Sequence, residues 1–154
     1  MSYLPWAFSM PEWFDCICTV VCLHKINAVL LKTYFVEDNA TIRENLIAAL
    51  EELTCVTSVG TAETENEGTA WLTDRYNAWD LAIVDLFLKQ GSGMGVLHAI
   101  KDRLPGQKVV VLSNYATADV RNRCQQLGAD AVFDKSTEID ALMDFCVKHC
   151  STLG

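Results

Sequence analysis

Short apolar runs recur along this chain from Leu30 onward, and longer segments with helical spacing of apolar residues separate them. Continuous short apolar runs are typical of strands that are buried on both faces of a sheet. The runs that predict strands are Leu30–Val36, Val56–Thr61, Leu81–Val84, Lys108–Leu112 and Ala131–Asp134.

The segments between these runs carry the signals of helices. Thr41 and Glu44 have the spacing of a capping box, and apolar residues then repeat at helical intervals up to Leu53. A weaker helix, acidic at its start, is predicted over about residues 63–75. A glycine-containing loop over residues 88–95 precedes a predicted helix from Val96 to Leu104, which Pro105–Gly106 ends. The last two predicted helices cover Ala118 to Leu127, which Gly128 caps, and Ile139–His149.

Five strands that alternate with five helices predict an α/β fold, because parallel strands need helical crossover connections. We therefore expect a doubly wound, five-stranded parallel sheet over residues 30–154. Residues 1–29 stand outside this unit as an N-terminal hydrophobic extension, and the length of the chain is typical of one domain.

Chemically distinctive residues follow four of the predicted strands. They are Glu37–Asp38, Asp85, Ser113 and Lys135. Each has a simpler explanation alone, as a helix cap, a turn residue or a solvated lysine. However, the carboxyl ends of parallel strands share one edge of a sheet, where ligands bind. Three carboxylates, a hydroxyl and an ammonium at one edge predict a site for a divalent metal and a phosphoryl group.

Composition and charge exclude several classes of protein. With 51% apolar and 21% charged residues the chain is globular, and its net charge of −8 argues against direct nucleic acid binding. The seven cysteines are an odd number without the spacing of a secreted disulfide framework, so we expect reduced thiols in a cytoplasmic protein. No apolar stretch approaches the ~20 residues that span a bilayer.

The N-terminal extension is too apolar for an ordinary solvated tail, and three interpretations stay open. It packs on the domain or on a second copy, it results from a mis-assigned translation start, or it touches a membrane-bound kinase or the bilayer surface. The aromatic and aliphatic side chains at issue are Trp6, Phe8, Trp13, Phe14, Ile17, Val20 and Val21.

Four motifs together resemble the receiver domain of two-component response regulators, from about Leu30 to His149. They are Tyr34-Phe35-Val36-Glu37-Asp38-Asn39, Ile83-Val84-Asp85-Leu86-Phe87-Leu88 with Gly93, Val111-Leu112-Ser113-Asn114-Tyr115, and Val132-Phe133-Asp134-Lys135-Ser136. The resemblance implies a flavodoxin-like receiver fold and a role in phosphorelay signal transduction rather than in metabolism as an enzyme.

The resemblance also implies a role for each site residue. Asp85 matches the aspartate that accepts a phosphoryl group, with Ser113 and Lys135 as its phosphoryl contacts. The implied Mg²⁺ ligands are Asp38, Asp85 and the carbonyl of Phe87, with Glu37 in support, and the implied switch pair is Ser113 with Phe133. The implied partners are a sensor histidine kinase or a histidine phosphotransfer protein and an unknown downstream protein.

Some features depart from the family pattern or leave alternatives open. Lys89 stands where a proline is common, and Phe133 lacks a tyrosine hydroxyl. Only 19 residues follow Lys135, so we expect no C-terminal output domain, and a homodimer stays open.

A receiver-like binding module that is never phosphorylated is one alternative function. A haloacid-dehalogenase-type phosphotransferase is another, although that class needs a second acid where this chain has Phe87.

Overall fold

The computed structural model describes residues 29–153, and the predicted N-terminal extension lies almost wholly outside the described residues. The described chain forms one sheet of five parallel strands in the order β2-β1-β3-β4-β5. The strands are β1 (Leu31–Val36), β2 (Val56–Ala62), β3 (Leu81–Val84), β4 (Lys108–Ser113) and β5 (Ala131–Asp134). The predicted doubly wound sheet is therefore confirmed.

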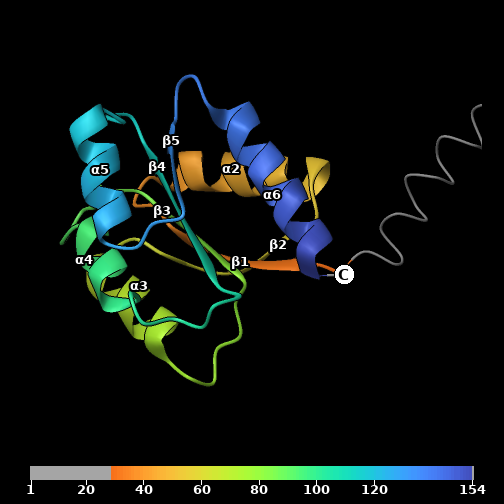
Figure 1. The fold of residues 1–154 in the computed structure, drawn as a ribbon, viewed down its shortest axis with the longest axis horizontal. Helices are drawn as coiled ribbons and strands as arrows, with labels where there is room; N and C mark the ends of the chain where they lie inside the picture. Colours follow the sequence, from red (N-terminus) through yellow and green to blue (C-terminus); the bar gives the residue numbers. More distant parts are fainter. Residues whose placement is uncertain (1–28, 154) are drawn as a thin grey trace, which may run out of the picture.

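Five helices cover the two faces of this sheet (Figure 1). They are α2 (Ala40–Leu53), α3 (Glu65–Thr73), α4 (Gly93–Ala99), α5 (Ala118–Gln126) and α6 (Ile139–Leu153). α2 and α6 pack on one face, and α3, α4 and α5 pack on the other. The strand order reverses direction between β1 and β3, and ligands bind at such a switch point in folds of this kind.

Two apolar layers, one on each face of the sheet, form the core. Alternate residues of β3 serve the two layers, with Ala82 and Val84 against α3–α5 and Leu81 and Ile83 against α2 and α6. All four are buried, which is why this strand is continuously apolar in the sequence. The central strands therefore hold their carboxyl ends rigidly at one edge of the sheet.

Three of the predicted helix boundaries are wrong, and one of them is the end of α6, which continues past the predicted His149 to Leu153. Helix α2 begins before Thr41, because the side chain of Asn39 is the cap and accepts a hydrogen bond from the amide of Ile42 at 3.0 Å. Thr41 and Glu44 therefore lie inside the helix and form no capping box. Helix α4 ends at Ala99, and Leu104 is exposed because it forms a turn with Gln107 instead of continuing the apolar face.

The expectation of reduced thiols is wrong for one pair of cysteines. Cys55, between α2 and β2, forms a disulfide with Cys150 on α6, with their Cα atoms 6.3 Å apart. The sequence could not predict this pair, because 95 positions separate the two residues. Cys124 and Cys146 are free and buried, and burial raises the pKa of the Cys146 thiol to about 12. No helix within residues 29–153 is long and apolar enough to cross a membrane.

Candidate functional site

The three predicted carboxylates converge at the carboxyl edge of the sheet. Strands β1 and β3 are neighbours, and Val36 pairs with Val84, so Glu37 and Asp85 leave the sheet side by side. One oxygen atom each from Glu37, Asp38 and Asp85 lies within 4.8 Å of the others. Glu37 and Asp85 are only 5% and 7% exposed, so their charges are poorly screened by water. The predicted convergence of the acidic residues is confirmed.

Lys135 completes this cluster from the end of β5. Its Nζ atom lies 2.5 Å from Oε2 of Glu37 and 3.0 Å from Oδ2 of Asp85. The amide of Lys135 donates to the carbonyl of Ser113 at 3.1 Å, which ties the start of this loop to β4. The side chain is only 10% exposed. The ammonium therefore neutralises part of the charge that two buried carboxylates would otherwise leave uncompensated.

The ionisation of the cluster reflects burial and charge pairing. Burial, helped by the negative charge of Asp85, raises the pKa of Glu37 despite hydrogen bonds from Lys135 and Asn39 that act to lower it. Burial alone would lower the pKa of Lys135, but its contacts with Glu37 and Asp85 outweigh burial and raise that pKa. The lysine is therefore held in its charged form, ready to contact a further anion.

Ser113 and Phe133 lie on neighbouring strands beside the acidic cluster. Ser113 is fully buried at the end of β4, and its Oγ atom accepts a hydrogen bond from the amide of Tyr115 at 3.2 Å. The ring of Phe133 is partly buried and meets the ring of Phe145 edge to face, at 6.1 Å between centroids. The assignment of these residues as a switch stays a prediction.

Phe87 lies two residues after Asp85, on the loop that follows β3. Its amide donates to Oδ1 of Asp85 at 3.4 Å, while its ring is exposed and meets Tyr115 edge to face at 5.3 Å between centroids. The backbone of Phe87 is thus close to the carboxylate of Asp85. Its carbonyl as a metal ligand stays a prediction.

The donor set suits Mg²⁺. Carboxylate and carbonyl oxygens are the ligands that this ion prefers, and it keeps several waters, so two or three protein oxygens suffice. The cluster offers oxygens from Glu37, Asp38 and Asp85 and contains no thiol or imidazole, which would favour a softer metal. The residues present therefore fit the ion that the resemblance implies.

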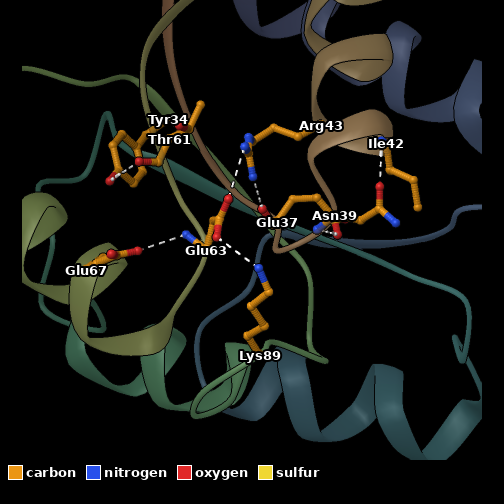
Figure 2. Close-up of polar contacts among 9 residues, drawn as sticks. All are labelled: Tyr34, Glu37, Asn39, Ile42, Arg43, Thr61, Glu63, Glu67 and Lys89. Atoms are coloured by element: carbon orange, nitrogen blue, oxygen red, sulfur yellow. Dashed lines mark hydrogen bonds and ion pairs between the residues drawn. The ribbon is translucent and has the colours of Figure 1, made fainter.

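Sequence reasoning missed two acidic residues, Glu63 and Glu65, that contact the loops around this site. Glu63 lies between the side chains of Arg43 and Lys89, and Arg43 also donates to the carbonyl of Glu37 at 2.7 Å (Figure 2). Glu65 accepts a hydrogen bond from the amide of Ser92 at 2.7 Å. The signal was available, since both follow the second predicted strand at the same edge of the sheet. From the sequence alone, these residues indicate only the acidic start of a helix, and α3 in fact begins at Glu65.

The family model for the response regulator receiver domain matches residues 34–146 of this chain, which is most of its length. The chain belongs to this family. The match includes all of the strand-end residues discussed above, so the family and the flavodoxin-like fold expected from the sequence are both confirmed.

Known relatives of this receiver domain include photosynthetic apparatus regulatory proteins called RegA. The protein from Rhodobacter capsulatus is 29% identical over 103 residues, which are 67% of this chain and 54% of RegA. RegA from Cereibacter sphaeroides matches with the same identity and coverage. The chain thus spans about half the length of the curated relatives that it matches.

Solved structures of receiver domains share the fold of this chain. The receiver domain of the Francisella response regulator 1452 has a TM-score of 0.69 and 17% identity, over 80% of this chain and 99% of that chain. A response regulator from Burkholderia pseudomallei, solved with a phosphorylated aspartic acid and a calcium ion, has a TM-score of 0.66 and 20% identity, over 80% and 70% of the two chains. At these low sequence identities, the similarity to the two structures shows a shared fold and nothing about function.

Proposed function

We propose that this receiver domain is a phosphorylation switch of a two-component system, in which Asp85 accepts a phosphoryl group. The observation that carries the proposal is the position of Lys135, whose ammonium contacts both Glu37 and Asp85 within a buried acidic cluster. A cation that contacts two of three clustered carboxylates is placed to bind a phosphoryl group beside a metal that the carboxylates hold.

The side chains divide the chemistry of the transfer between them. An ionised oxygen of Asp85 attacks the phosphorus of a phosphohistidine, the bond from phosphorus to the imidazole nitrogen breaks, and the imidazole takes up a proton. Lys135 is placed to contact a phosphoryl oxygen, and the Ser113 hydroxyl, whose oxygen already accepts from Tyr115, can donate its proton to another. No separate base is required, because a carboxylate is already nucleophilic.

We propose that Mg²⁺ is bound by Asp38 and Asp85 with the carbonyl of Phe87, and that Glu37 supports it. When bound, this ion supplies positive charge that neutralises the carboxylates and the phosphoryl oxygens. The oxygen-only donor set within 4.8 Å supports this assignment. The related structure from Burkholderia pseudomallei, which holds a phosphorylated aspartic acid and a calcium ion, is in accord with it.

The partners follow from this chemistry. The donor is a sensor histidine kinase or a histidine phosphotransfer protein, and the output is a change in a surface that another protein recognises. The net charge of −8 supports an output through protein contacts rather than through direct nucleic acid binding. A cytoplasmic location, the absence of an enzymatic activity on other substrates, and the formation of a homodimer stay predictions from the sequence.

Phosphorylation by acetyl phosphate tests the proposal without knowledge of the cognate kinase. We expect intact-protein mass spectrometry to detect one added phosphoryl group on the wild type in the presence of Mg²⁺, and none on Asp85→Asn. Asp130→Asn is a matched control, because Asp130 is also a hydrogen-bonded carboxylate but follows α5 at the opposite edge of the sheet. Equal labelling of the wild type and Asp85→Asn would refute the assignment.

A further inference from the structure

We propose that Glu63 and Glu65 are positioning residues that hold together the two loops carrying the metal-binding groups. The inference rests on the proposed Mg²⁺ site and extends it to residues that do not touch the metal. One loop, residues 37–39, joins β1 to α2 and carries Glu37 and Asp38. The other, residues 85–92, follows β3 and carries Asp85 and the carbonyl of Phe87. Both meet the β2–α3 junction, which we define as residues 62–65.

Glu63 joins the two loops through its carboxylate (Figure 2). Oε1 lies 3.3 Å from Nη2 of Arg43, and Oε2 lies 3.3 Å from Nζ of Lys89. The other guanidinium nitrogen of Arg43 donates to the carbonyl of Glu37, and the Arg43 side chain is only 13% exposed. One carboxylate thus connects the backbone beside the first metal ligands with the loop that follows Asp85.

Glu65 holds the second loop by direct contact with its backbone. Its Oε2 accepts from the amide of Ser92 at 2.7 Å, and its own amide donates to the carbonyl of Gln90 at 3.0 Å. Glycines of the loop and of the first turn of α4 approach the Glu65 side chain closely, and Gly91 also has a positive φ of 80° that favours glycine. A Cβ atom would lie 2.4 Å from the Glu65 side chain at Gly91 and 2.0 Å from it at Gly95. Two glycines of the Gly-x-Gly-x-Gly segment therefore make room for Glu65.

The backbone adds a third connection at the same junction. The amide of Glu37 donates to the carbonyl of Ala62 at 3.0 Å, so the first loop is also attached to the end of β2. Without bound metal, repulsion among the three carboxylates acts to separate the two loops. A metal site needs its ligands held within about 0.5 Å of their working positions. Contacts that fix both loops to one rigid junction therefore lower the cost of bringing the ligands together.

The affinity for Mg²⁺ alone, measured by isothermal titration calorimetry on the full chain, tests the inference. We expect Glu65→Ala and Glu63→Ala each to weaken Mg²⁺ binding, by about tenfold for Glu65→Ala, which is the lower end for residues that support metal ligands. Glu65→Gln should retain nearly wild-type affinity, because its amide oxygen can still accept from Ser92. Glu51→Ala is the matched control, since Glu51 also accepts one backbone hydrogen bond, from Ser58 at 2.9 Å, outside the site.

The outcomes separate this inference from the proposed function. If the wild type fails to bind Mg²⁺ at millimolar concentration, the proposed function is wrong and the inference falls with it. If the wild type binds but both alanine variants bind equally well, only the inference is wrong.

Thermal unfolding identifies any variant that does not fold. If Glu65→Ala is unfolded, Glu63→Ala decides, because Glu63 is 40% exposed and its loss leaves no buried cavity. An affinity loss in Glu65→Gln as large as in Glu65→Ala would also overturn the positioning role of its hydrogen bond.

Discussion

At the scale of single residues, Gly93 has the tightest backbone constraint near the site. A Cβ atom there would lie 2.1 Å from the carbonyl oxygen of Asp85. We expect Gly93→Ala to lower the free energy of unfolding by roughly 3 kcal/mol, because the obstacle is backbone rather than a flexible side chain. Urea unfolding checks this. Gly106→Ala is the control and should be neutral within about 1 kcal/mol, because no atom lies within 4 Å of its added Cβ.

The buried phenol of Tyr34 should make the stability of the protein depend on pH. Burial, with a contribution from Glu67, raises the pKa of its phenol to about 12. The unfolded chain ionises nearer pH 10, so it binds fewer protons than the folded chain between these values, and stability falls as pH rises there. We expect a loss of roughly 1 kcal/mol between pH 9 and 11 from this group. Urea unfolding at several pH values measures it.

Substitution of Tyr34 isolates the effect of its ionisation. Tyr34→Phe should have a smaller alkaline loss of stability, while at pH 8 it should lose about 1 kcal/mol with the hydrogen bond to the Thr61 carbonyl. Tyr76→Phe changes an exposed ring and should behave as the wild type does. The same alkaline loss in Tyr34→Phe and in the wild type would contradict the prediction.

At the scale of elements, the Cys55–Cys150 disulfide connects the start of β2 to α6. It closes a loop of 95 positions, and cross-links of this kind typically stabilise by about 2–4 kcal/mol through the unfolded chain. We expect Cys55→Ala to lower the free energy of unfolding by that amount under oxidising conditions. With a reductant present, the wild type and the variant should be nearly equally stable. A variant as stable as the oxidised wild type would argue against the bond.

At the scale of the whole molecule, the proposed switch connects the site with α5, β5 and α6. Arg121 of α5 donates to the carbonyl of Val132 in β5 and to that of Ala116. It also pairs at 2.7 Å with Glu138, which directly precedes α6, so its side chain connects these elements next to Phe133. We expect phosphorylation to draw Ser113 toward the phosphoryl group and to shift these elements as a population change.

Amide NMR spectra test this switch. Ser113→Ala should still accept a phosphoryl group from acetyl phosphate, but its amide shifts in α5, β5 and α6 should be much smaller than those of the wild type. Thr152→Ala serves as a control, because Thr152 bonds only within the last turns of α6. Shifts of the same size in Ser113→Ala and the wild type would rule out Ser113 as the link.

The sequence alone determined the sheet and the edge at which the site forms. The apolar runs predicted the strands, and the residues that follow them predicted the site, because parallel strands bring their carboxyl ends together whatever the details of packing. These residues are Glu37–Asp38, Asp85, Ser113 and Lys135. Helix ends were less well predicted, since the local cap at Asn39 and the turn at Leu104 depend on side-chain hydrogen bonds that several patterns allow.

Contacts between side chains that are distant in the sequence became known only from the packed fold. Lys135 contacts Glu37 and Asp85 across 98 and 50 positions, and Cys55 meets Cys150 across 95. Glu65 fits against Gly91 and Gly95 only because α3 and the loop after β3 pack closely. Such contacts follow from the packing of elements on the sheet. The periodicity of a sequence identifies the elements and their buried faces, but it carries no information on the distance between two particular side chains.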